Sequence, residues 1–339
     1  MMDPQDQSVP TIGLTMGDPC GVGAEIIVKA LADDDLRARA RFMIFGFSDQ
    51  LAYTADALEL PWSAARDEHD HAHAHRESII ALDYDEIAMP PTMPRGPSVI
   101  GGRASLAFLD GAIEASKTGM IDAMVTAPIS KTSWLEAGVR KFPGHTELLA
   151  DRFNAKRVAM MFIAPQLRVV LATIHESLSE LRNLFTIGRV FDPIELADNA
   201  LREWFGCESP KLAVCGLNPH AGEEGRFGDE EQRVITPAIL MAEHAGIDAS
   251  GPFPADTVFA KAVTGEYDCV VAMYHDQGLI PIKLLAWQDA VNVTLGLPII
   301  RTSPDHGTAF DIAGRGKAHP GSMKAAIHLA IDLANQRRS

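Results

Sequence analysis

The sequence predicts an α/β protein with a mainly parallel sheet and two domains. Its 339 residues suggest two domains, at about 150 residues for each. Short apolar segments alternate with helical patterns, which is typical of α/β architecture. Most of these segments are continuously apolar, as expected of parallel strands that helices cover on both faces. The hydrophobic share of 47% and the charged share of 22% are ordinary for globular proteins and exclude a disordered, collagen-like or disulfide-scaffold chain.

Eight apolar segments are predicted strands because each is short and ends at turn-forming or polar residues. They are residues 11–16, 41–45, 123–126, 158–163, 167–173, 211–217, 269–273 and 291–295.

Helical spacing is clearest in two segments. Residues 105–117 place Leu106, Leu109 and Ile113 on one stripe, and residues 322–335 repeat the pattern from Met323 to Ala334. Near residue 230, Asp229 and Gln232 have the spacing of a reciprocal helix cap, and Pro237 would kink or restart that helix.

The net charge of the chain limits the kinds of molecule that the protein is expected to bind. With 30 basic and 45 acidic side chains, the net charge is −15, which disfavours binding to nucleic acid or to anionic membranes. The N-terminal segment lacks the pattern of a signal peptide, and no apolar run reaches the roughly 18 residues of a membrane helix. The four cysteines are scattered without a C-x-x-C pair, as in reduced cytosolic proteins. We therefore expect a cytoplasmic protein.

One segment, residues 67–75, is rich in histidine: from His69 to His75, histidines alternate with Asp and Ala. Its acidic, polar setting favours a solvated loop, and metal binding is the alternative.

A glycine-rich motif follows the first predicted strand: Thr-Met-Gly-Asp-Pro-Cys-Gly-Val-Gly-Ala-Glu at residues 15–25. Its G-x-x-x-G-x-G spacing differs from the G-x-G-x-x-G of a Rossmann dinucleotide fold, which is therefore disfavoured. Two interpretations remain: a tight strand-to-helix turn, or a loop whose backbone approaches a ligand closely.

A second motif, Pro-Gly-His-Thr-Glu, occupies residues 143–147. Pro-Gly predicts a turn, and Thr146 could cap the helix that follows. The amide groups at a helix start attract anions, and His145 and Thr146 would add donors there. A plain capped turn is the alternative.

Three histidines follow apolar strands: His175, His220 and His275. Ligands of parallel α/β sheets bind at the carboxyl ends of strands. Three imidazoles at such ends could hold a divalent metal and leave a position open for substrate. Asp256 and Asp276 are nearby candidates for supporting or additional ligation.

Polar residues interrupt the last apolar stretch. Lys283 is flanked by aliphatic residues, Asn292 lies in a predicted strand, and Arg301 ends an apolar run. A buried lysine needs a charge partner, and an arginine can clamp a carboxylate or phosphate bidentately. A surface position for both cations is the alternative.

Together the motifs at 15–23, 143–147, 216–223, 273–278 and 296–309 resemble the 4-hydroxythreonine-4-phosphate dehydrogenase family of pyridoxal phosphate biosynthesis. The resemblance runs from about residue 11 to residue 335. It implies an isocitrate/isopropylmalate-dehydrogenase-like fold, not a Rossmann fold, with two α/β/α domains and a cleft. The domains would comprise residues 1–140 plus 302–339, and residues 141–301 with the dimer interface and most metal and substrate residues.

The resemblance also implies which residues form the site. The metal ligands would be His175, His220 and His275, one of them from the other subunit of a homodimer whose active site lies at the subunit interface. The substrate residues would be His145, Thr146, Lys283, Asn292 and Arg301. The cofactor, NAD or NADP, would lie near Gly296, Asp305, His306, Gly307 and Thr308, and the metal would be Zn, Mg or Co.

The implied activity is NAD(P)-dependent oxidation of a CH–OH group. 4-Phosphohydroxy-L-threonine would become a 3-oxo acid that decarboxylates to 3-amino-2-oxopropyl phosphate. Lys283 or Asp256 would accept the proton. The residues at 172–178 depart from the usual pattern of the biosynthetic enzymes. Those at 280–285 and 310–315 look closer to a paralogous branch that oxidises 4-phospho-threonate or -erythronate, or a dihydrodiol dicarboxylate. A metal-dependent hydrolase or lyase on the same histidines, or a non-catalytic sensor, are alternatives of other classes.

Overall fold

The computed structural model describes residues 9–68, 78–84, 86–88 and 93–338. The chain divides into two compact units, of which unit 1 comprises Met1–Asn154 and Pro298–Ser339, and unit 2 comprises Ala155–Leu297. The histidines of the 67–75 tract lie outside the described residues. None of the described helices is long and apolar enough to cross a membrane.

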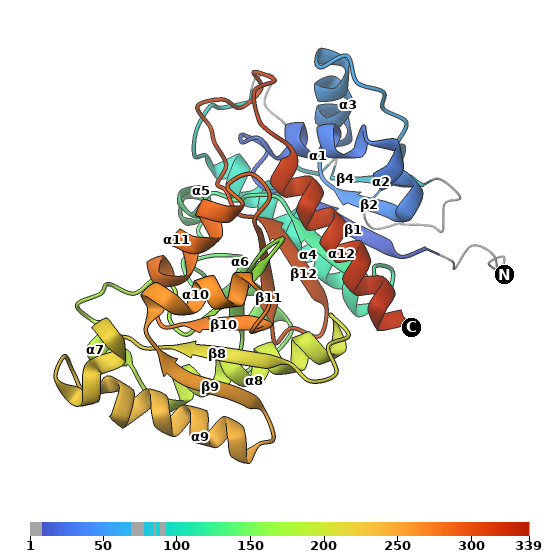
Figure 1. Cartoon of the computed structure of the whole chain (residues 1–339). Helices are drawn as coiled ribbons and strands as arrows, with labels where there is room; N and C mark the ends of the chain where they lie inside the picture. The colour runs from blue at the N-terminus through green and yellow to red at the C-terminus, as the bar shows by residue number, and fades with distance from the viewer. Residues whose placement is uncertain (1–8, 69–77, 85, 89–92, 339) are drawn as a thin grey trace. The chain divides into compact units, whose positions relative to one another are not determined.

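Unit 1 contains parallel strands in the order β3-β4-β2-β1-β5-β12. Figure 1 labels β4, β2, β1 and β12 of these strands. β1 lies at the centre and is buried along nearly its whole length, so that Leu14 faces Ile44 of β2 on one side and Val125 of β5 on the other. The strands are β1 (Thr11–Thr15), β2 (Arg41–Phe45), β3 (Ala65–Glu68), β4 (Ile79–Asp83), β5 (Ala123–Thr126) and β12 (Ile300–Pro304).

Helices pack on these strands. The longest, α4, begins after Ser98, whose side chain accepts a hydrogen bond from the Gly101 N–H, so the helix starts six residues before the predicted position. α12 packs on β12, where the Thr302 hydroxyl donates to the Ala326 carbonyl at 2.8 Å. The helices are α1 (Gly23–Leu31), α2 (Asp34–Arg39), α3 (Ser48–Ala57), α4 (Val99–Lys117), α5 (Lys131–Glu136), α6 (His145–Arg152) and α12 (Gly321–Arg338).

Unit 2 has the strand order β11-β6-β7-β10-β8-β9, in which only the β11–β6 and β6–β7 pairs of the described residues are antiparallel. The strands are β6 (Ala159–Ala164), β7 (Leu167–Leu171), β8 (Lys211–Cys215), β9 (Asp248–Phe253), β10 (Cys269–Ala272) and β11 (Val291–Leu295).

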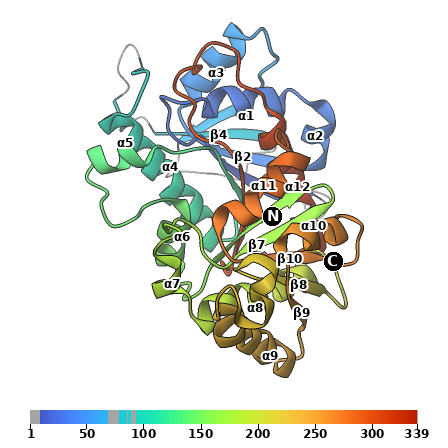
Figure 2. The ribbon, with the colours of Figure 1, turned by 60° about the vertical axis from the view of Figure 1, so that its left-hand side comes forward.

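Two pairs of helices cover these strands from opposite sides, α8 with α9 and α10 with α11 (Figure 2). The helical segments are α7 (Leu181–Leu184), α8 (Ile187–Glu203), the turn η2 (Pro219–Gly225), the π-helix η3 (Glu231–Ile235), α9 (Thr236–His244), α10 (Ala255–Val263) and α11 (His275–Leu285).

All eight predicted strands and the mainly parallel pairing are confirmed. The prediction missed β3, β4, β9 and β12. β9 lies at the end of its strand order and contains Gly251 and Pro252, which are typical of edge strands. The predicted cap at Asp229 is wrong, because a π-helix begins two residues later without a side-chain cap. Pro237 does restart the helix, in the first turn of α9.

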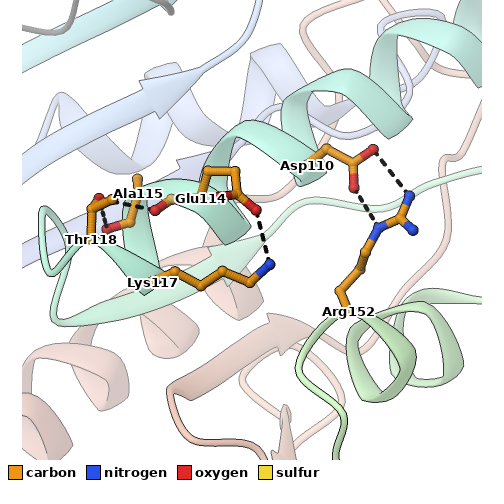
Figure 3. Close-up of polar contacts among 6 residues, drawn as sticks. All are labelled: Asp110, Glu114, Ala115, Lys117, Thr118 and Arg152. Atoms are coloured by element: carbon orange, nitrogen blue, oxygen red, sulfur yellow. Dashed lines mark hydrogen bonds and ion pairs between the residues drawn. The ribbon is translucent and has the colours of Figure 1, made fainter.

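The unit boundaries differ from the expected ones and place His145, Thr146 and Arg301 in unit 1. One physical reason is the attachment of α6 to α4. Arg152, at the end of α6, donates to both carboxylate oxygens of Asp110 on α4, at 3.0 and 3.4 Å (Figure 3). The other reason is that β12, which carries Arg301, pairs with β5.

Candidate active site

The three histidines expected to bind a metal lie at the carboxyl ends of three adjacent parallel strands of unit 2. β10 pairs with β7 on one side and with β8 on the other. His175 follows β7, His220 follows β8, and His275 begins α11 just after β10. This edge of a parallel sheet is where α/β proteins bind their ligands.

His175 and His275 lie together. Their ring centroids are 6.0 Å apart, which is close enough for both rings to ligate one ion. The His275 Nδ1 is 2.7 Å from the Asp276 carboxylate, a contact of the kind that fixes the orientation of a metal-binding imidazole. The side chain of His275 is 42% exposed, so its ring can be reached from solvent.

His220 is presented differently, on a left-handed turn. The four residues His220, Ala221, Glu223 and Glu224 all have positive φ, between 42° and 58°. This conformation costs L-residues about 1–2 kcal/mol each. The exposed His220 ring lies 6.2 Å from the ring of Phe227, measured between centroids. In the described part of the chain, no three His, Cys, Asp or Glu side chains form a group that could hold a metal. One chain thus supplies a histidine pair and a separate third histidine.

The remaining candidates in unit 2 lie on three elements. Lys283, on α11, holds its ammonium 5.4 Å from the centroid of the Trp287 ring, which is a cation–π contact. Asn292 is buried in β11, and its Oδ1 has no hydrogen-bond partner among the described residues. Asp256 is exposed in the first turn of α10. A buried acceptor without a partner is rare in native proteins and is consistent with a ligand contact.

In unit 1, Arg301 is a buried cation near the start of β12. Its side chain is 3% exposed, and its Nε and Nη2 donate to the Thr126 hydroxyl of β5 at 3.2 and 2.6 Å. Burial lowers the pKa of Arg301 to about 10, and Glu147 partly opposes this shift. The guanidinium is therefore charged at neutral pH while it has lost most of its hydration, which strengthens its attraction for an anion. The sequence analysis did not identify Thr126 as a partner of Arg301. The only sign of such a role in the sequence is that Thr126 is a polar residue at the end of a predicted apolar strand.

His145 lies beside this arginine, at the start of α6. Burial, and then the positive charge of Arg301, hold the pKa of His145 well below its usual range, so the ring is neutral at physiological pH. Its Nε2 atom is buried without a partner among the described residues, and its ring packs edge-on against Trp134 at a centroid distance of 5.9 Å. The structure therefore brings Arg301 and His145 together around one place that suits an anionic group.

Thr146 does not cap α6, contrary to the prediction. The helix begins at His145, Gly144 occupies the cap position, and no side chain caps it. Thr146 is instead buried in the first turn, because α6 starts two residues earlier than a threonine cap requires.

The segment expected to bind the cofactor, Asp305–Thr308, joins the glycine-rich motif. The Val22 N–H donates to the Thr308 carbonyl at 3.0 Å, and a Cβ at Gly21 would lie 2.8 Å from that carbonyl oxygen. The Asp305 N–H donates to the Ser322 hydroxyl at 3.1 Å, whereas His306 and Gly307 are exposed. The motif therefore forms the connection between β1 and α1, and its backbone supports this loop.

Two residues of α1 hold the chain that follows this segment. Glu25 accepts a hydrogen bond from the Ala318 N–H at 2.7 Å, and Lys29 donates to the Gly316 and Ala318 carbonyls at 2.9 and 2.7 Å. The two side chains also form an ion pair at 2.8 Å. Their i, i+4 spacing on a helix was visible in the sequence, but their partners were not.

Gly296, the remaining cofactor candidate, belongs to unit 2. Its φ is 85°, and a Cβ there would lie 2.2 Å from the Arg157 carbonyl oxygen. Glycine is therefore required at this position by the chain itself, independently of a cofactor.

Nearly the whole chain is similar in sequence to known dehydrogenases. A family model described as the pyridoxal phosphate biosynthetic protein PdxA matches residues 38–330. The 4-hydroxythreonine-4-phosphate dehydrogenase of Geobacter metallireducens is 47% identical over 331 residues, which cover 97% of both chains. The D-threonate 4-phosphate dehydrogenase of Cupriavidus necator is 42% identical over 97% of this chain and 98% of its own.

The solved structures agree. The crystal structure of 4-hydroxythreonine-4-phosphate dehydrogenase from Klebsiella pneumoniae has a TM-score of 0.85 at 39% identity, and the match covers 96% of this chain and 99% of that one. These similarities define a protein of the α/β dehydrogenase type and confirm the predicted fold class. The chain belongs to the PdxA family of pyridoxal phosphate biosynthetic proteins.

Proposed function

We propose that this protein oxidises 4-phosphohydroxy-L-threonine with NAD or NADP and a divalent metal. The product is a 3-oxo acid, which loses its carboxylate as CO₂ to give 3-amino-2-oxopropyl phosphate. The observation that carries the proposal is the placement of His175, His220 and His275 at the ends of three adjacent parallel strands. The names of the relatives support the same reaction.

His175, His220 and His275 would hold the cation. The donor set fits, because neutral imidazoles suit zinc and cobalt, and the Asp276 contact orients one ring. When bound, a divalent cation stabilises the negative charge that develops on a substrate oxygen during oxidation and decarboxylation. Asp305, His306, Gly307, Thr308 and Gly296 would hold the nicotinamide cofactor, which would supply the hydride acceptor for the oxidation.

The other residues bind and orient the substrate. Arg301 and His145, with Thr146 beside them, bind an anionic group of the substrate, because the buried guanidinium and the buried Nε2 atom can both donate to its oxygens. The buried Oδ1 of Asn292 accepts a hydrogen bond from a substrate hydroxyl or amine. Lys283 or Asp256 takes up the proton that the reacting hydroxyl releases.

A comparison of three substrates tests this proposal. We expect NAD⁺ reduction, followed as the rise in reduced-nicotinamide absorbance, to be fastest with 4-phosphohydroxy-L-threonine. 4-Phospho-D-threonate is the second candidate, since a relative of similar identity is named for it. An unphosphorylated dihydrodiol dicarboxylate is the third. A higher kcat/KM for either alternative would reassign the substrate, and no reduction with any of them would favour a metal-dependent hydrolase or lyase.

We further propose that the protein is a homodimer whose active site lies at the subunit interface. α11, which begins at His275, exposes Ile280 and Leu284, and Trp287 follows just after its end; their exposed fractions are 59%, 82% and 76%. The i, i+4 spacing places Ile280 and Leu284 on one face of the helix, and Trp287 lies two residues beyond the last helical residue. An exposed apolar group of this kind is typical of a protein interface, and a second copy would cover it and supply one of the three histidines of each site.

Replacing Leu284 with Glu should therefore convert the dimer into monomers. Sedimentation velocity at micromolar concentration measures the change, and we expect NAD⁺ reduction to fall with the dimer fraction. Tyr53→Glu is the matched control, because Tyr53 is 74% exposed on unit 1 and should leave both unchanged. A Leu284→Glu protein that sediments like the wild type and retains its activity would contradict this interface.

The cysteines fit a reducing compartment, so we place the protein in the cytoplasm. All four, Cys20, Cys207, Cys215 and Cys269, are free thiols, and three of them are buried.

A further inference from the structure

The left-handed turn that carries His220 is held by a buried carboxylate. Glu231, which is 3% exposed, accepts hydrogen bonds on Oε1 from the Leu217 and Asn218 N–H groups at 2.8 and 2.7 Å. Its Oε2 accepts a third from the Asn218 side-chain amide at 3.0 Å. These donors belong to the two residues that precede the turn, so the carboxylate fixes the point at which the chain enters it.

The same carboxylate also lies under the middle of the turn. A Cβ placed on Gly222 would be 2.6 Å from Oε2, and one on Gly216 would be 3.3 Å from Oε1. Glu231 thus fills the space that the left-handed backbone encloses. Charge-assisted hydrogen bonds from backbone N–H groups are among the stronger polar contacts, and here they offset a conformation that the four non-glycine residues would otherwise avoid.

A second buried side chain connects this turn to the other two histidine loops. Gln277 of α11 donates from Nε2 to the Gly216 carbonyl at 2.8 Å, and its Oε1 accepts from the Met273 N–H at 2.6 Å. The Met273 carbonyl in turn accepts from the Thr173 hydroxyl at 2.7 Å. Residue 173 precedes His175, residue 273 precedes His275, and residue 216 precedes His220, so one buried network joins the three loops.

We propose that Glu231 and Gln277 are positioning residues for the metal-binding histidines. This inference rests on the proposed function, because it assigns these side chains to the site where His175, His220 and His275 bind a divalent cation. Neither side chain ligates the cation itself. They fix the backbone from which the imidazoles project, so that His220 meets the ion in one orientation without an ordering cost on binding.

Glu231→Gln tests the first of these roles. Glutamine has the same shape, but its amide nitrogen cannot accept the bond from Asn218, so one of the three contacts is lost and the charge assistance disappears. We expect the affinity of the full-length protein for Co²⁺, measured by its visible absorption against a competing chelator, to fall about 10- to 100-fold. We also expect a lower kcat at saturating metal. Glu224→Gln, an exposed position on the same turn, is the matched control and should bind Co²⁺ as the wild type does.

Gln277→Glu provides a second variant should Glu231→Gln fail to fold. It retains the acceptor for Met273 and loses the donor to Gly216, and we expect a similar fall in Co²⁺ affinity. Because both side chains act on residues 216–218, the double variant should lose less affinity than the product of the two single losses.

The possible outcomes distinguish the positioning role of Glu231 and Gln277 from the proposed function on which it rests. Wild-type protein that binds Co²⁺ and reduces NAD⁺, alongside folded Glu231→Gln and Gln277→Glu proteins of unchanged Co²⁺ affinity, would overturn the positioning role alone. The positioning role would also be overturned if either variant melted at a lower temperature in the presence of a chelator but bound Co²⁺ with unchanged affinity. That result would show that the side chain has a purely structural role. Wild-type protein that neither binds Co²⁺ nor reduces NAD⁺ would overturn both.

Discussion

Replacing Arg301 with Met is expected to reduce kcat/KM for the phosphorylated substrate by roughly 30- to 4,000-fold. The guanidinium is buried and lies beside a neutral His145, so a substrate anion bound there as proposed would lose its charged partner in a site of low polarity. Removing one member of a buried, hydrogen-bonded charge pair costs about 2–5 kcal/mol, and each 1.4 kcal/mol is about tenfold. Steady-state kinetics with NAD⁺ and 4-phosphohydroxy-L-threonine measure the loss.

Two further variants make that result specific. Arg301→Lys retains the charge but not the planar fork, so we expect an intermediate loss. Arg37→Met removes an arginine from the surface helix α2, where it pairs with the exposed Asp34, and should change kcat/KM little. Wild-type kinetics in a folded Arg301→Met protein would show that the anion binds elsewhere.

Replacing His220 with Ala is expected to remove tight binding of the divalent metal. The imidazole is exposed at the end of β8, so its loss should leave the core of unit 2 intact. A bound cation contributes several kcal/mol to the stabilisation of developing negative charge, so we expect kcat/KM to fall by roughly 10³-fold or more. The metal content after dialysis and the rate of NAD⁺ reduction are the two measurements.

His244→Ala is the matched control, because it removes an exposed histidine from the last turn of α9 in the same unit. It should retain wild-type metal content and activity. If His220→Ala did so as well, the three-histidine site would be wrong.

The acidic composition does not conflict with an anionic substrate. The net charge of −15 is spread over the chain, and exposed charges are screened beyond about 8 Å in physiological salt. In the proposed site the buried Arg301 would act on the substrate anion at contact distance, where the local dielectric is low and its attraction is strong.

The sequence predicts the strands well because parallel strands that are covered on both faces are apolar throughout. β12 was missed because Ile300 is its only aliphatic residue and the next three, Arg301, Thr302 and Ser303, are polar, although the strand is as buried as its neighbours. The hydrogen bonds of Arg301 to Thr126 and of Thr302 to Ala326 explain how these polar side chains are buried. A pattern of apolar residues cannot anticipate such partners.

The candidate site was predicted as a set of histidines that follow strands, and the pairing of β7, β10 and β8 places those strand ends side by side. The shape of the site could not be predicted. The left-handed turn at His220 has glycines only at its fourth and final helical positions, and its support comes from Glu231, which carries no local signal. The contact between Val22 and Thr308 joins segments from nearly opposite ends of the chain.

The most direct test follows reduced nicotinamide and CO₂ in the same reaction. With 4-phosphohydroxy-L-threonine, NAD⁺ and a divalent cation, we predict one CO₂ released for each NAD⁺ reduced, and neither product once a chelator has removed the cation. CO₂ release or substrate cleavage without any NAD⁺ reduction would contradict the dehydrogenase function and identify a metal-dependent lyase or hydrolase.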